Sequence, residues 1–558
     1  MNLSRDASND ACKGYNFNMT DETPGSGPES QENQEQELAP YPGTREIPRW
    51  NLGELPEPPK FAWRNILLLL GPGLFMAGAA IGGGEWLTGP VITARYGAGL
   101  LWLATLSILG QAFYNVEVSR YALYTGEPIF AGKFRTRPGP RLWLVVYGLF
   151  DFSMFFPYLV AAAATPLIAI FRGDLPDPTN NPDDEFLVRI TSVALFLLAL
   201  SPLLIGGKVY NSIKVIMTIK IVLVMGFLVL MAAMFSNLGT WTEIGSGFLK
   251  FGNVPVKTAD GSPSLDNIFA ALFEGRPLPE MDFTFVGFLC TLVAIAGAGG
   301  LGNSAVSNYT RDQGWGMGAR VGAIPSFFGG RKIELSHVGM VFKPTQDALV
   351  RWRAWLSHVL RDQWVVWMPG CIVGVGLPAM MSLLFIERGA VLTDGWQVAT
   401  ITAGGVRDAM GATWGPTFWV ITLFIAFIVL VTGVSQGVDG FLRRWIDVLW
   451  IAIPGVRKFE PKQIRGVYFG VLAVYVVLGA IMLCVGKPTT LLFIGSIIMN
   501  FALGFTCMHT LVVNTTLLPQ PLRPGWFCRI ALFMAGLFFL AVASVSTYIK
   551  LLDAGVIG

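Results

Sequence analysis

The chain has 558 residues, of which 53% are hydrophobic and 14% are charged, and its mean hydropathy is +0.54. Soluble domains carry about 25% charged residues, so this composition excludes an ordinary soluble protein. The formal net charge of +3 excludes the strongly basic field of a nucleic-acid-binding protein. Six scattered cysteines and three histidines indicate neither a disulfide framework nor a zinc site. We expect an all-helical polytopic protein whose main partner is the lipid bilayer.

Residues 1–60 differ in composition from the rest of the chain. The stretch SQENQEQELAPYPGTREIP is polar, acidic and contains proline. Such a segment buries too little apolar surface to offset the entropy that ordering costs. The sequence therefore predicts a disordered tail over 1–60 and a membrane domain over 61–558.

Apolar runs of about 20 residues recur from residue 61 onward, and each is long enough to cross the bilayer as a helix. The sequence predicts eleven spans, at 66–96, 99–122, 142–170, 187–205, 212–235, 283–305, 364–386, 417–440, 466–484, 489–513 and 528–549.

Lysine and arginine gather in alternate loops, which sets the expected orientation because cytoplasmic loops retain positive charge. The segments 129–141, 306–362 and 441–465 are basic, whereas 236–282 carries few basic residues. We expect an integral protein of the plasma (inner) membrane, with a cytoplasmic N-terminus and an external C-terminus.

The first span carries three consecutive glycines, Gly82, Gly83 and Gly84, followed by Glu85. Glycine is a poor helix former, so this run predicts local unwinding. Unwound backbone at membrane depth is tolerated where it faces protein or a water-filled cavity. The alternative is close helix packing, which small residues also permit.

The sixth span repeats this pattern with Gly297, Gly299, Gly300 and Gly302, followed by Asn303. Interrupted helices at corresponding positions of two halves indicate the midplane binding site of a secondary transporter. Two such clusters, five spans apart, favour unwinding over packing.

Residues 71–143 contain an opening GPG, the turn YGAGLLW and the ending RYALYTGEPIFAGKFR of the second predicted span, and the eighth ends in SQGVDGFLRRW. These motifs resemble segments of the first, second and eighth helices of the NRAMP family of divalent-metal transporters. The resemblance implies a LeuT-type fold with discontinuous helices 1 and 6, working by alternating access. It implies two inverted five-helix repeats, at about 64–235 and 283–515, and an extra helix at about 526–549.

The chain departs from the family at the metal ligands. The first-helix Asp-Pro-Gly-Asn aligns with Gly82 to Glu85, and the sixth-helix Met-Pro-His aligns with Leu301 to Asn303. Ala298 keeps the position whose backbone carbonyl would be a ligand. Without the soft thioether, an oxygen-rich site of Glu85, the Ala298 carbonyl, Asn303 and waters would favour Mg²⁺ or Mn²⁺ over iron or copper.

Asp151 is an ionisable residue in the third predicted span, where a charge is costly and a functional role is the default interpretation. The resemblance aligns it with an aspartate on the family's proton path. Met154 stands where the family has the next carboxylate of that path, so this chain has one proton-carrying group fewer there. The alternative is a structural pair with a cation that the sequence does not identify.

Further charged residues lie near the predicted cytoplasmic ends of spans. Glu117 and Arg120 are three residues apart, which favours an intrahelical pair over a gate. Asp439 either reaches the membrane interface or forms a gate contact with Arg443.

These observations favour a secondary-active transporter of a divalent metal cation, which is cargo rather than a cofactor. A second hypothesis is an amino acid or other small organic solute, with Glu85 binding its amine and glycine-rich backbone holding its carboxylate. A third is a membrane-embedded enzyme or receptor-like scaffold. The sequence lacks Walker A, HExxH and GxSxG motifs, so we do not expect an enzyme. It indicates no particular protein partner.

Overall fold

The computed structural model describes residues 39–40, 42–60, 73, 76–78, 83–205, 209–258, 262–321, 338–390, 394–459 and 463–557. The stretch from Leu38 to Gly558 forms one compact unit. Residues 1–38 of the predicted tail lie outside the described residues.

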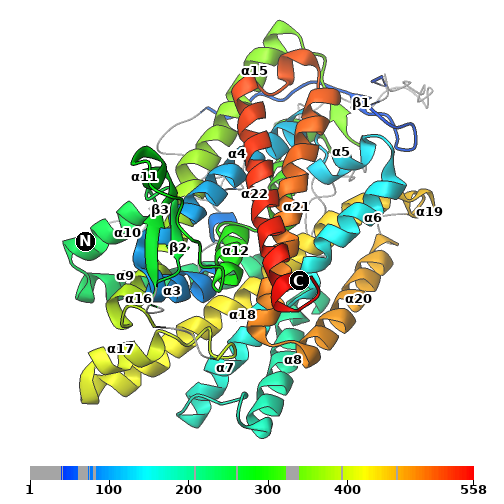
Figure 1. The fold of residues 1–558 in the computed structure, drawn as a ribbon. Coiled ribbons are helices and arrows are strands. Elements are labelled where there is room, and N and C mark those ends of the chain that lie inside the picture. Colours follow the sequence, from blue (N-terminus) through cyan, green and yellow to red (C-terminus); the bar gives the residue numbers. More distant parts are fainter. Residues whose placement is uncertain are drawn as a thin grey trace, which may run out of the picture. The chain divides into compact units, whose positions relative to one another are not determined.

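Helices make up most of the described chain (Figure 1). The α-helices are α3 (Glu85–Tyr96), α4 (Trp102–Thr125), α5 (Ile129–Arg135), α6 (Pro140–Asp151), α7 (Tyr158–Arg172), α8 (Pro182–Ile205), α9 (Val209–Phe235), α10 (Leu238–Gly247), α11 (Ile268–Phe273), α12 (Val286–Ile295), α13 (Ala305–Asp312), α14 (Gly318–Val321), α15 (Gln346–Arg361), α16 (Met368–Phe385), α17 (Ala403–Ala409), α18 (Gly411–Ala452), α19 (Pro454–Arg457), α20 (Ile464–Val485), α21 (Pro488–Thr516) and α22 (Trp526–Asp553).

Shorter elements join these helices. The 3-10 helices are η2 (Gly97–Leu100), η3 (Phe152–Phe155), η4 (Gly300–Ser304) and η6 (Gln520–Leu522), and η5 (Asp362–Trp367) is a π-helix. Strand β1 (Asn51–Leu52) pairs in parallel with β4 (Met340–Val341), and β2 (Asn253–Val256) pairs antiparallel with β3 (Ser264–Asn267).

Each of the eleven predicted spans contains helix in its described part. Within the described chain, seven helices are long and apolar enough to cross a membrane, or eight if the pair Glu85–Leu100 and Trp102–Thr125, bent by 91°, is one span. The shorter helix Ile219–Phe235 is also apolar. The protein is therefore an all-α polytopic membrane protein. Its membrane and the side on which each terminus lies remain predictions.

The third predicted span contains a break that the sequence analysis missed. Helix α6 passes through η3, Phe156 takes an extended conformation, and α7 begins after Pro157. A residue before proline is driven out of the helical region by the pyrrolidine ring, which accounts for the break. It adds an irregular segment to the two that the glycine clusters predict.

Residues 42–59 are held by contacts to the membrane domain. Strand β1 pairs with β4, the Thr44 amide donates to the Arg135 carbonyl at 2.8 Å, and the Trp355 indole donates to the Pro56 carbonyl at 2.9 Å. This differs from the expectation of a disordered tail through residue 60. The physical reason is that the partners of this backbone lie on distant parts of the chain, which composition alone does not reveal.

The same segment links basic loops that the charge pattern assigns to one side. It contacts α5, within 129–141, and β4 and α15, within 306–362 (Figure 1). Arg457, at α19 within 441–465, donates to the Glu46 carbonyl at 2.8 Å. These three segments therefore share one face, as the charge pattern expects.

Candidate functional site

The sixth predicted span is broken at its glycine cluster. Helix α12 ends at Ile295, and the chain becomes helical again in η4 and α13. Gly297, Gly299 and Gly300 have φ angles of 123°, 67° and 49°, a region that glycine enters at little cost. The predicted interruption of helix 6 is confirmed.

Gln111 of α4 holds this break in place. Its Nε2 donates to the Ala296 carbonyl at 2.8 Å, while its Oε1 accepts from the Ala298 amide at 3.2 Å and from Asn303 Nδ2 at 2.6 Å. Gln111 is fully buried. One side chain thus satisfies backbone groups that the interrupted helix leaves without helical partners.

The first glycine cluster leads directly into a new helix. Gly83 and Gly84 form a bend and a turn, and α3 begins at Glu85. Gly82 lies outside the described residues. Glu85 is the first residue of α3, where the partial positive charge of a helix N-terminus favours a carboxylate. The indole of Trp86 fixes this end by donating to the Ala399 carbonyl at 3.1 Å.

The two breaks meet at Glu85. Its Oε1 accepts a hydrogen bond from the Gly297 amide at 3.4 Å, and the side chain is only 2% exposed. The carboxylate therefore lies at the junction of the two interrupted helices, as the sequence predicts for a midplane site.

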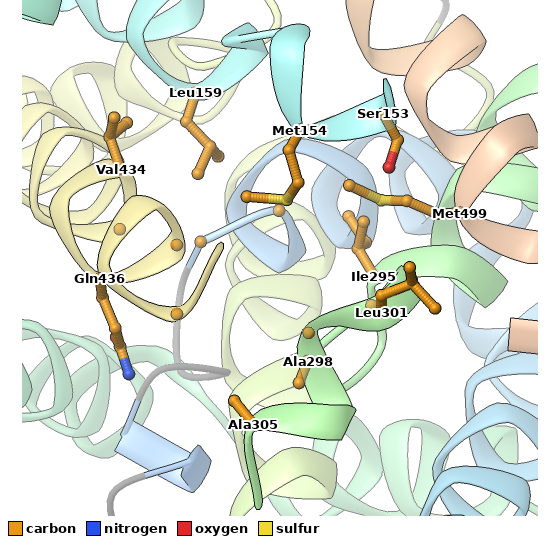
Figure 2. A pocket seen from close by; sticks show the side chains of 18 of the residues that line it. Ser153, Met154, Leu159, Ile295, Ala298, Leu301, Ala305, Val434, Gln436 and Met499 are labelled. Atoms are coloured by element: carbon orange, nitrogen blue, oxygen red, sulfur yellow. The ribbon is translucent and has the colours of Figure 1, made fainter. Parts of the chain in front are cut away.

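A cavity of about 180 Å³ opens beside this junction. It lies among the start of α3, η3 and α7, the break before α13, and helices α18, α20 and α21. Side chains of Met154, Leu159, Val434, Gln436 and Met499 surround it (Figure 2). The predicted site residues that line it are Gly83, Gly84, Glu85, Gly297, Ala298, Gly299, Gly300, Leu301 and Gly302.

Asn303 does not line this cavity. Its amide nitrogen is bound to Gln111, whereas its Oδ1 is buried without a hydrogen-bond partner among the described residues. Its role as a ligand stays a prediction.

Asp151 forms a buried ion pair with Arg444 of α18. The guanidinium Nη2 lies 2.8 Å from both carboxylate oxygens, and the Trp445 indole donates to Oδ2 at 2.6 Å. Arg444 also donates to the Leu301 carbonyl at 3.1 Å, which ties the pair to the second break. The structure thus supplies the cation that the sequence analysis left unidentified. A role for Asp151 in proton movement stays a prediction.

The other predicted charged pairs are also present. Arg120 Nε lies 2.9 Å from Glu117 within α4, and Asn514 donates to the same carboxylate at 2.8 Å. Arg443 Nε lies 2.9 Å from Asp439 within α18. The first pair is buried and the second partly exposed, and neither pair lines the cavity.

Sequence reasoning missed Gln111, Arg444 and Gln436. A signal existed for Gln111, because it is an uncharged polar residue within the apolar run 99–122. Arg444 follows immediately after Arg443 in a basic stretch, so nothing local distinguishes the buried arginine from its partly exposed neighbour.

No protein-family model matches the chain, and no curated protein sequence matches it. Its fold is similar to that of a manganese transporter from Eremococcus coleocola. Two crystal structures of that transporter, a variant and a complex with an aromatic bis-isothiourea compound, align with TM-scores of 0.54 and 0.52. These alignments cover 88% of each chain, at 14% and 13% identity.

A structure of Mhp1, a nucleobase-cation-symport-1 family transporter, aligns with a TM-score of 0.45 at 14% identity, over 87% of this chain and 93% of that one. At these identities the likeness to the manganese transporter shows the fold alone. The chain has the LeuT-type fold, with helices 1 and 6 discontinuous, while its relation to the NRAMP family remains a resemblance of motifs.

Proposed function

We propose that this protein is a secondary-active transporter that moves a divalent metal cation by alternating access, with a hard ion such as Mg²⁺ or Mn²⁺ favoured. The LeuT-type fold and the cavity between the two helix breaks support a transporter of this general class. The metal is cargo and not a resident cofactor.

The observation that carries the proposal is the position of Glu85. Its carboxylate is buried at the junction of two interrupted helices and lines the cavity. Mg²⁺ keeps several waters and needs only one or two carboxylates, so a single glutamate with backbone oxygens suffices in principle. The carbonyl of Ala298, which lines the cavity, would be a further oxygen ligand, and Asn303 Oδ1, which is buried without a partner among the described residues, would have to turn toward the cavity to be another.

The test is Mn²⁺ uptake into proteoliposomes by the wild type and Glu85→Gln. We expect the variant to fold but to lose uptake by at least about a hundredfold, because the amide carries no charge to offset that of the ion. Glu280→Gln is the matched control, since the Glu280 side chain is 78% exposed in the segment between α11 and α12. Wild-type uptake that Glu85→Gln leaves intact would overturn the assignment.

A small organic solute is a second candidate, and two observations favour it. The cavity of about 180 Å³ is larger than a dehydrated ion needs, and a cavity of about 150 Å³ accepts benzene. Moreover, the described residues contain no group of three or more His, Cys, Asp or Glu side chains suited to a metal. Calorimetry with Mg²⁺, Mn²⁺ and a panel of amino acids would separate the two candidates.

A further inference from the structure

Lys220 is a buried cation that no part of the site described above uses. It lies in α9 with its side chain fully shielded from solvent. Among the described residues, its Nζ has neither a hydrogen-bond partner nor an ion-pair partner. An ammonium in this position is costly, because nothing in contact with it replaces the water that it has lost.

The surroundings of Lys220 place it next to the first helix break. Helix α16 packs against both α3 and α9. The neighbouring residue Ile221 lies so close to Gly78, which precedes the break, that a methyl group on that glycine would meet its Cδ1 at 2.6 Å. Glu85 begins α3, the helix that follows this break, and α16 packs against both that helix and the helix of Lys220.

Lys220 and Glu85 are thus buried groups of opposite charge on two helices that both pack against α16, and they are not in contact. If the two side chains were in contact, the ammonium hydrogens of Lys220 would occupy the carboxylate oxygens of Glu85. In the observed arrangement Glu85 accepts from the Gly297 amide and still lines the cavity, whereas Lys220 does not line it. The carboxylate is therefore balanced in charge and still available to cargo.

This balance of charge matters during alternating access, because the transporter must also change orientation without cargo. An empty transporter must return with Glu85 buried, and an uncompensated charge opposes any state that keeps it out of water. When a cation is bound, its own charge compensates the carboxylate, so the loaded transporter needs Lys220 less.

We propose that Lys220 is a fixed counter-cation that balances Glu85 while the cavity is empty and so allows the empty transporter to change orientation. This role rests on the proposed function, because it presumes a cationic cargo at Glu85. It makes Lys220 a positioning residue that acts through Glu85 and does not bind the cargo itself.

The first test is a thermal-unfolding cycle of the full chain in detergent, which needs no cargo. Lys220→Met and Glu85→Gln should each lower the unfolding midpoint by at least about 5 °C, because each leaves one buried charge alone. The double variant should recover at least about half of the summed loss. Lys250→Met, at an exposed position in the segment after α10, is the matched control.

The second test separates net flux from exchange in proteoliposomes, with Mn²⁺ as the probe. Net uptake requires the empty transporter to return, whereas exchange with internal Mn²⁺ does not. In Lys220→Met we expect net uptake to fall about tenfold and exchange to fall less than about twofold. Lys220→Arg, which keeps the charge, should restore most of the net uptake.

Two results would overturn the proposal. One is an unfolding cycle in which the losses from Lys220 and Glu85 simply add. The other is an equal loss of net uptake and exchange in Lys220→Met. If the wild type moves no Mn²⁺ at all, the proposed function fails, but the unfolding cycle still decides whether Lys220 balances Glu85. If Lys220→Met alone cannot be purified, recovery of a folded double variant supports the balance.

Discussion

Two pairs of opposite charges are buried near the same cavity, and they are built differently. Asp151 and Arg444 are in contact, with the guanidinium 2.8 Å from the carboxylate and the Trp445 indole as an additional donor. Glu85 and Lys220 are not in contact, since the Lys220 ammonium has no hydrogen-bond partner among the described residues. Both acids are 2% exposed or less, so burial does not distinguish them.

The two pairs differ in how much of each carboxylate remains available to bind another group. Both carboxylate oxygens of Asp151 accept from Arg444, and Oδ2 also accepts from the Trp445 indole, an arrangement suited to holding helices together. Glu85 accepts from the Gly297 amide at 3.4 Å and lines the cavity. A contact pair is suited to hold elements together, whereas a separated pair keeps a charge compensated and free to bind.

The largest effect should come from breaking the contact pair. Arg444→Met leaves the buried Asp151 with only the Trp445 indole as a donor and removes the donor to the Leu301 carbonyl, so we expect a loss of about 3–5 kcal/mol in unfolding free energy. Thermal or denaturant unfolding in detergent measures it, and the Asp151→Asn and Arg444→Met double variant should recover part of the loss.

The control for this prediction is Arg388→Met, which removes the exposed partner of Glu243. Surface pairs contribute at most about 1 kcal/mol. Similar losses in Arg444→Met and Arg388→Met would contradict a structural role for the buried pair.

A second variant tests how strongly the uncharged hydrogen bonds of Gln111 stabilise the second break, compared with the ion pair of Asp151 and Arg444. Gln111→Met removes the partners of the Ala296 carbonyl and the Ala298 amide while keeping a similar volume. Leaving buried backbone groups unsatisfied should cost about 2–3 kcal/mol, and Mn²⁺ uptake should fall with it.

Gln436→Met is the matched control for this variant. Gln436 lines the cavity on α18, and its side chain has no hydrogen bond to the described residues. Its replacement should change unfolding by less than about 1 kcal/mol. If both glutamine variants unfold alike, Gln111 does not hold the break.

Another buried contact pair, outside the spans, predicts a pH dependence. Glu127 and Arg135 are buried at 2.5 Å beneath residues 42–59. Burial alone would raise the pKa of Glu127, but the Arg135 guanidinium and the Gly339 amide outweigh it and lower the pKa below its ordinary value.

Since the pKa of Glu127 is lowered by folding, this stabilisation is fully present above the ordinary glutamate pKa and is lost as pH falls through the folded value. Unfolding of the wild type should therefore lose at most about 1.4 kcal/mol per pH unit from this group, and only in the acid range. Glu127→Gln should remove that part of the slope. An unchanged acid slope in the variant would exclude this pair as its source.

The sequence predicted some of these features and not others, for physical reasons. Glycine clusters act locally through backbone freedom, so the break after Ile295 and the turn before Glu85 were predictable. The pairing of Asp151 with Arg444 joins residues 293 positions apart, and no local pattern encodes it. In the sequence, Lys220 is a basic residue within an apolar run. Its proposed role in balancing Glu85 depends on how α9 packs in the fold, which the sequence does not reveal.

The smallest effect should come from Asp439 and Arg443, which form an intrahelical pair 13% and 18% exposed. Arg443 also lies 3.7 Å from Asp312 of α13, so Asp439→Asn leaves the guanidinium with a partner. We expect a loss of about 0.5 kcal/mol or less in unfolding free energy.

If Asp439 is part of a gate, Mn²⁺ flux in proteoliposomes should nevertheless change by more than this loss implies, because the contact would then differ between the two orientations. Wild-type flux combined with wild-type stability would assign Asp439 to the membrane interface. The comparison would then rest on Asp151 with Arg444, which are in contact, and Glu85 with Lys220, which are not.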